Sequence, residues 1–161
     1  MKVAKFGFDK VRKQIEAMRK QQEGQLDKKI VRWLQYIAED VLNDARRKGS
    51  YIDRTGNLRS SIGCRIYRNG EPIHAYEVEL VGNPTEPGKR LPLSELQVTF
   101  DNAMDDYAAK YVASIEGYTI VLVAGMNYAY YVEAKGYNVL HQSNILLQQH
   151  VKELKERLNK K

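Results

Sequence analysis

A long amphipathic stripe in the first third of the chain restricts the possible folds most. Its apolar side chains recur at steps of three and four, which places them on one face of a helix. The stripe consists of Leu26, Ile30, Trp33, Ile37, Val41 and Ala45. This pattern predicts a helix over residues 8–48 that ends before Gly49. Gly24 weakens a helix by about 1 kcal/mol relative to alanine, so we expect a break or a kink there.

The middle of the chain carries strand signals. Asn69-Gly70 is a hairpin turn, because both residues tolerate positive φ. It joins two alternating segments, residues 64–68 and about residues 73–81. In the second segment, one face is expected to hold Tyr76, Val78 and Leu80, and the other Glu77 and Glu79. Residues 118–124 are apolar on both faces, which predicts a central strand covered on both sides.

Two further helices are expected, at about residues 101–113 and 143–159, where apolar residues again keep helical spacing. The proline-containing stretch 82–92 between them and the hairpin is predicted to be a surface loop. A chain of 161 residues suits one domain. We therefore predict an α+β fold, in which a long N-terminal helix and a C-terminal helix pack on an antiparallel sheet of about four strands. Residues 1–25 would form a basic helical arm that could be mobile until assembly, and residues 26–161 the domain.

Charge is distributed unevenly along the chain. The net charge is +6, but residues 71–150 alone carry four basic and ten acidic side chains. Basic ends and an acidic middle fit head-to-tail attraction between like subunits, or nucleic acid near the N-terminal arm. A set of solvated helix faces is the third interpretation. Because no segment has the apolar length of a signal peptide or a membrane span, we expect cytosol-like conditions and no membrane.

The chain shows no pattern of catalytic, metal-binding or cofactor-binding residues. Cys64 is the only cysteine, so paired-cysteine zinc sites and internal disulfides are excluded. The three histidines lack metal-ligand spacing. Glu77 and Glu79 lie two apart on one strand face, where a solvated surface is the simpler interpretation than acid–base chemistry. No phosphate loop and no nucleophile motif is present. We therefore expect no enzyme, no metal and no cofactor.

Residues 53–62 form the most distinctive local pattern. Thr55 is a good N-cap for a short helix, and Gly56 allows an unusual dihedral or a close approach before it. Leu58 and Ile62 are four apart and would share a buried face. Arg54 and Arg59 flank the positive end of this helix, where they could hold an anion. The alternative is an ordinary connecting helix with solvated arginines.

A tyrosine cluster follows the predicted strand 118–124. It consists of Tyr128, Tyr130, Tyr131 and Tyr137, with Glu133 and Lys135 among them. Tyrosines supply large amphipathic contact area in interfaces, and they can stack on bases. Packing in the core and at its rim is the alternative interpretation.

Two motifs together resemble a known family. Thr55-Gly56-Asn57-Leu58-Arg59-Ser60-Ser61-Ile62 resembles the Thr-Gly-x-Leu-x-x-Ser-Ile signature of phage tail-component proteins, the tail-completion or neck proteins of long-tailed bacteriophages and prophages. Asn127-Tyr128-Ala129-Tyr130-Tyr131-Val132-Glu133 resembles the Tyr-Ala-x-Tyr-Val-Glu signature of the same family. The order and spacing of the two signatures and the helices at both ends extend the resemblance over most of the chain. The loop and helix at about residues 82–113 resemble an insertion.

The resemblance implies a structural protein of the virion, assembled in the host cytoplasm, that acts at the head–tail junction or upper tail. Its expected partners are like subunits in a ring and neighbouring neck or tail proteins. Thr55, Gly56, Asn57, Leu58 and Ile62 would hold the short helix against the sheet, and Tyr128, Tyr131 and Glu133 would fix the segment after the strand. Basic arms would then meet acidic sheet faces of neighbouring subunits.

A different class of function remains open at this point. A basic nucleic-acid-binding module would use side chains from the arm and from the region around the first signature. These are Arg12, Lys13, Arg46, Arg47, Arg54 and Arg59. Binding to DNA that weakens steeply with salt would favour this alternative.

Overall fold

The computed structural model describes residues 8–160, with side chains from residue 13 onward. The chain divides into two compact units, Met1–Trp33 and Leu34–Lys161. Helix α1, Phe8–Arg47, contributes to both. Of the predicted arm, residues 1–7 lie outside the described residues. The predicted break at Gly24 is wrong, because α1 continues through this position with hydrogen-bonded turns on both sides that offset the weak helix propensity of glycine.

The second unit contains a three-stranded antiparallel sheet. Its strands are β1 (Ile62–Arg68), β2 (Glu71–Tyr76) and β3 (Tyr118–Ala124), in the order β2-β1-β3. The α+β class with a long N-terminal helix and a C-terminal helix is confirmed, with three strands instead of about four. The predicted central place of β3 is wrong. An apolar strand shows that both of its faces are covered, and this pattern does not reveal whether both of its edges are paired.

The hairpin turn is confirmed, since Asn69 and Gly70 adopt φ of 51° and 82°. However, β2 ends at Tyr76 and does not reach Val81. Side chains replace the next rung of the ladder: the Ile62 carbonyl accepts a hydrogen bond from Arg46 Nη2 at 2.9 Å, and the Val78 N–H donates to Gln97 Oε1 at 3.3 Å. Val78 is buried, whereas Leu80, which was predicted on the same strand face, is exposed because the regular strand has already ended.

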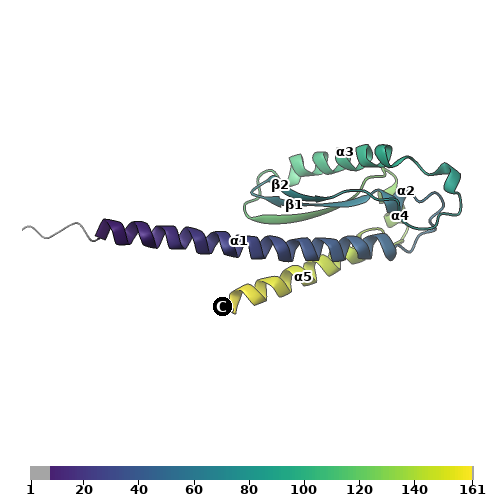
Figure 1. Ribbon diagram of the computed structural model, residues 1–161. Helices are drawn as coiled ribbons and strands as arrows, with labels where there is room; N and C mark the ends of the chain where they lie inside the picture. The colour runs from purple at the N-terminus through teal and green to yellow at the C-terminus, as the bar shows by residue number, and fades with distance from the viewer. Residues whose placement is uncertain (1–7, 161) are drawn as a thin grey trace, which may run out of the picture. The chain divides into compact units, whose positions relative to one another are not determined.

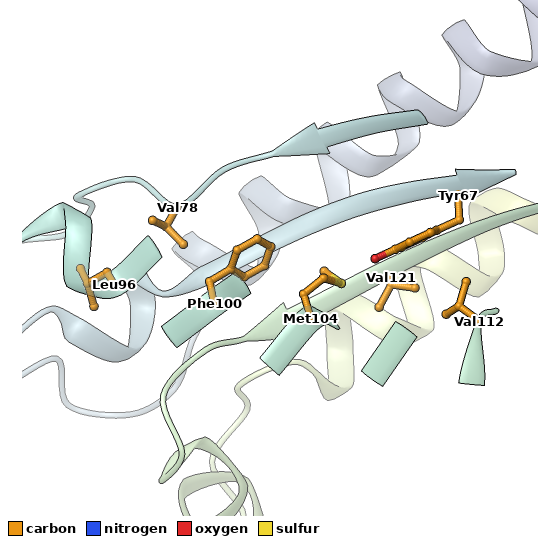
Figure 2. Packing of buried hydrophobic residues seen from close by; sticks show 7 residues of the cluster. All are labelled: Tyr67, Val78, Leu96, Phe100, Met104, Val112 and Val121. Atoms are coloured by element: carbon orange, nitrogen blue, oxygen red, sulfur yellow. The ribbon is translucent and has the colours of Figure 1, made fainter. Parts of the chain in front are cut away.

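Helix α3 (Leu93–Tyr111) covers one face of the sheet, as Figures 1 and 2 show. The predicted helix began at residue 101. The observed helix starts directly after Pro92, and its buried side chains Leu96, Phe100 and Met104 recur every four residues. They pack in one cluster with side chains from the sheet and the flanking segments. The other members are Tyr67, Val78, Val112 and Val121.

Residues 34–47 of α1 and helix α5 (His141–Asn159) lie beyond the opposite face. The Tyr76 hydroxyl donates to the Gln35 carbonyl at 2.9 Å, which ties β2 to α1. Ser143 Oγ lies 3.0 Å from Asp44 Oδ2 and His150 Nε2 lies 2.8 Å from Asp40 Oδ2, which ties α5 to α1. The predicted stripe of α1 is buried in this unit, at Ile37, Val41 and Ala45, together with apolar neighbours. These neighbours are Leu34, Ala38 and Leu42.

Three short helices complete the described chain: α2 (Asn57–Ser60), η1 (Pro87–Lys89) and α4 (Ala129–Ala134). They lie in the connections that lead into β1, into α3 and away from β3. No helix in the described residues combines the length and the apolar character needed to cross a membrane.

Candidate functional site

The first signature forms a tight, buried passage from α1 to β1. Its N-cap is Gly56 with φ of 78°, not Thr55 as predicted, although Thr55 Oγ1 still accepts the Asn57 N–H at 3.3 Å. The positive φ of Gly56 favours glycine, and a Cβ at this position would displace the Arg90 guanidinium that packs against it. Leu58 and Ile62 are both buried, but Ile62 already belongs to β1 because α2 ends at Ser60.

Asn57 connects this passage to the loop before α3. Its Oδ1 accepts the Leu91 N–H at 2.8 Å, and its Nδ2 donates to the Lys89 carbonyl at 3.3 Å. The same loop is held by Arg90, whose Nη2 donates to the Val81 carbonyl at 2.6 Å. The stretch of residues 77–92 is therefore fixed by side chains where no regular ladder is available.

Replacing Asn57 by alanine is expected to lower the free energy of unfolding by about 1–3 kcal/mol, because the Leu91 N–H and the Lys89 carbonyl lose their partner. Chemical denaturation measures the loss. Exposed Asn102, replaced in the same way, is the matched control and should change stability by less than about 0.5 kcal/mol. Equal effects of the two substitutions would contradict the role of Asn57.

The two signatures meet in space. Thr55 and Tyr128 line the same cavity, and burial raises the pKa of the Tyr128 phenol while the neighbouring Thr55 side chain opposes the rise. This cavity of about 420 Å³ lies between them, with Leu58 and Val132 in its wall. After β3, the Gly125 N–H donates to the Ser61 carbonyl at 3.0 Å. The two signatures are far apart in the sequence, but the fold brings their segments into contact around α2.

Glu133 supports the C-terminal helix. Its Oε1 accepts the N–H groups of Leu140 at 3.0 Å and His141 at 2.7 Å, at the start of α5. A carboxylate at this place satisfies free N–H groups and complements the positive end of the helix dipole. Sequence reasoning missed this role, because an acid eight residues before a helix is not part of a local capping motif.

Tyr131 does not pack into the unit. It is 67% exposed and its ring lies edge-on to that of Tyr130, which is 76% exposed. Tyr128 and Tyr137 are also exposed. The segment around α4 thus presents several tyrosines to the surface.

Arg46, Arg47 and Arg59 line one cavity of about 410 Å³, but the Glu79 carboxylate lies in the same cavity and pairs with Arg46, so they do not form a free basic patch. Arg46 is 7% exposed and hydrogen-bonds to the carbonyls of Ile62 and Glu77, and burial lowers its pKa against the attraction of Glu79. Arg59 donates to the carbonyls of Arg46 and Gly49 and pairs with Asp53 at 3.3 Å.

Arg54 pairs with Glu86 at 2.7 Å, and Arg47 is exposed in the last turn of α1. The side chain of Arg12 lies outside the described residues, and Lys13 is exposed on the arm. Arg54 and Arg59 therefore each face a carboxylate, and the anion site beside the helix end stays a prediction.

A second cavity follows the outer edge of β3. This trough has a volume of about 400 Å³, and its walls come from α3 and α5. Tyr107 and Tyr111 line the α3 wall, and Leu140 and Leu147 line the α5 wall. The spacing of the two tyrosines predicted a helix face. That this face borders an open strand edge could not be predicted, because it depends on the order of the strands in the sheet. Among residues 8–160, no group of three potential metal-ligating His, Cys, Asp or Glu side chains occurs.

Comparison with known proteins identifies the family of the chain. Residues 9–134 match the family described as "Bacteriophage HK97-gp10, putative tail-component". No curated protein and no solved structure matches the chain. The matched range contains both signatures, the whole sheet and α3. The chain therefore belongs to the HK97-gp10-like family of phage tail components.

Proposed function

We propose that this tail component acts at the head–tail junction or upper tail of a long-tailed phage or prophage. It forms ring-type contacts with like subunits during tail completion or head–tail joining, and it performs no catalysis. The observation that carries this proposal is the group of exposed tyrosines around α4 and the end of α3. Tyrosine side chains combine a large apolar ring with a polar hydroxyl, and they supply contact area in interfaces.

The exposed tyrosines belong to two segments that the fold brings to the ends of β3. Tyr107 and Tyr111 come from α3, and Tyr128, Tyr130 and Tyr131 come from the second signature. Their exposure fits subunit contacts, which are enriched in tyrosine at their centres.

Charge gives such contacts a direction. The first unit of the chain, which contains the predicted arm, carries exposed Lys13, Lys20, Lys28 and Lys29, here called the arm lysines, and α3 carries exposed Asp105 and Asp106. A closed ring of head-to-tail contacts requires two different, complementary surfaces on each subunit. Arg46 is not part of the arm surface, because it is buried beneath the 77–81 segment.

Reversing the four arm lysines to glutamate is expected to abolish assembly at concentrations where the wild type forms a discrete oligomer, because each contact loses its attraction. Light scattering after size exclusion measures the native mass across a wide concentration range, with and without short duplex DNA. Lysine-to-arginine variants at the same positions keep the charge and should assemble. Unchanged assembly of the reversed variant would contradict the charge hypothesis. A monomer that gains mass only with DNA would favour the nucleic-acid alternative.

The place of action is tested separately in a phage whose copy of this gene is disrupted. Filled heads and unjoined tails are expected, and the supplied chain should restore joined particles in electron micrographs. Infectious particles formed without the chain would contradict the proposal.

A further inference from the structure

The outer edge of β3 presents hydrogen-bonding groups that the sheet does not use. The Gly125 N–H donates to the Ser61 carbonyl, and the Asn69 N–H donates to the Gly117 carbonyl. The backbone N–H and C=O groups of odd-numbered residues between Gly117 and Gly125 therefore point toward β1. By the alternation of an antiparallel ladder, the N–H and C=O groups of Ile120 and Leu122 point away from β1. An unpaired edge of this kind is a template for another strand.

The surroundings of this edge suit an added strand. The trough described above runs along β3, with Tyr107 and Tyr111 on one side and Leu140 and Leu147 on the other. The strand itself is long enough for pairing, since β3 contains seven residues. A strand laid in the trough would gain backbone hydrogen bonds and apolar walls on both faces.

The sheet has a second open edge at β2, where pairing is confined to the residues after the bulge, because the register shifts between Ile66 and Tyr67 and Pro72 has no N–H. In β1, the N–H and C=O groups of even-numbered residues face β2, and those of odd-numbered residues face β3. Ala75 pairs with the odd-numbered Arg65, so the N–H and C=O groups of Ala75 point outward from β2. Ala75 is also exposed. Exposed Ile73 adds apolar surface beside it. β2 and β3 both run antiparallel to β1, so they are parallel to each other. A neighbour displaced sideways in a ring would therefore present its β2 parallel to β3.

Charge also favours this pairing. The Arg68 guanidinium lies 5.5 Å from the centre of the Tyr118 ring, at the start of β3. Exposed Glu71 begins β2. Parallel alignment brings Glu71 of a second copy to the start of β3, where Arg68, the last residue of β1, lies beside Tyr118.

We propose that β2 of a second copy of this chain pairs in parallel with the open edge of β3, in the trough between α3 and α5. Successive copies then join their sheets head to tail. The contact rests on the proposed function, because it supplies one of the ring interfaces that this function needs. It is heterologous, since each subunit uses two unlike edges, and such contacts generate rings when the rotation closes.

Disulfide cross-linking tests the pairing in the full-length chain. Ala75 and the β3 residues Thr119 and Val123 all belong to the α3 side of the sheet, by register with Arg65, Tyr67 and Gly63. Within one copy, β1 separates Ala75 from β3, so the two positions lie about 10 Å apart. This distance exceeds the reach of a disulfide, which fails beyond about 7 Å between Cα atoms. Every disulfide between the two edges must therefore join different copies.

The double variants that combine Ala75→Cys with Thr119→Cys, Val121→Cys or Val123→Cys cover three registers. Alignment of Glu71 with Tyr118 places Ala75 beside Val121, because Glu71 and Tyr118 both pair with Arg68 and Ala75 and Val121 both pair with Arg65. Mild oxidation of at least one is expected to give a ladder of covalent oligomers on a non-reducing gel, while each single variant gives no ladder. Cys64 does not compete, because it is buried and burial raises the pKa of its thiol to about 12. Covalent dimers from a β3 single variant would overturn the proposal in favour of a two-fold pairing of β3 with itself.

Ala75→Pro provides a second measurement. It removes one outward N–H and leaves the bonds between β1 and β2 intact, as prolines on edge strands do. The midpoint concentration of assembly should rise about tenfold, as expected for one lost hydrogen bond per contact. Ala75→Val keeps the N–H and is the control.

The two measurements separate this inference from the proposed function. Oligomers that form without cross-links and ignore Ala75→Pro would overturn the edge pairing and leave the ring function standing. A chain that stays monomeric and gives no ladder would also overturn the edge pairing, and the phage complementation experiment would still decide the function.

Discussion

Replacing Phe100 by alanine is expected to lower the free energy of unfolding by about 3–5 kcal/mol, the usual range for a buried phenylalanine. Phe100 is 0% exposed and lies in the cluster between α3 and the sheet, as Figure 2 shows. A Cβ on Gly63 would lie 2.6 Å from the Phe100 ring, and one on Gly125 would lie 2.8 Å from the Phe100 backbone. The ring thus fills space that Gly63 keeps open, Gly125 allows the close approach of the Phe100 backbone, and loss of the ring leaves a cavity.

Urea denaturation of the full chain measures this change. Val98→Ala on the same helix is the matched control, because Val98 is exposed and should change stability by less than about 0.5 kcal/mol. A loss below about 1 kcal/mol for Phe100→Ala would contradict a rigidly packed cluster, since it would require the cavity to collapse almost completely.

Replacing Arg46 by methionine is expected to lower the free energy of unfolding by about 2–5 kcal/mol. Methionine retains much of the apolar stem, but the carbonyls of Ile62 and Glu77 lose the guanidinium, and an unsatisfied buried carbonyl costs about 1–3 kcal/mol. The end of the sheet between β1 and residues 77–81 should loosen first. Denaturation gives the stability, and amide hydrogen exchange at Val78 and Val81 gives the local effect.

Two control variants separate the contributions of Arg46. Arg47→Met removes an exposed arginine from the same helix turn and should change stability by less than about 0.5 kcal/mol. Glu79→Gln removes only the ion pair with Arg46. Because the Glu79 carboxylate is largely exposed, loss of this ion pair should lower the free energy of unfolding by less than about 1 kcal/mol. If Glu79→Gln matched Arg46→Met, the ion pair and not the carbonyl contacts would carry the stabilisation.

Local signals in the sequence predicted the local structure well. The stripe through Ile37 and Val41 predicted the buried face of α1, and Asn69-Gly70 predicted the hairpin. The order of strands was not accessible in the same way, because the pairing of β3 with β1 joins segments far apart in the chain. The end of β2 was also missed, since it depends on Arg46 and Gln97 from two different helices.

The candidate site was predictable to a similar degree. The need for glycine at position 56 followed from the signature itself, and the structure adds the Arg90 contact. The roles of the arginines did not follow, because a sequence shows that a side chain is charged but not which carbonyl or carboxylate it will meet. Arg46 and Arg59 were grouped as a basic surface, and both are engaged inside the fold.

The strand order β2-β1-β3 has a consequence for the order in which the domain can fold. β1 and β2 are joined by a tight turn and can pair early, whereas β3 must wait until the loop and α3 between Arg68 and Tyr118 are arranged. Closing that longer loop costs more chain entropy, so this pairing is expected to be the slower event. The trough beside β3 then exists only after the last strand has docked. A chain still leaving the ribosome would therefore lack this surface, which delays association until each subunit is complete.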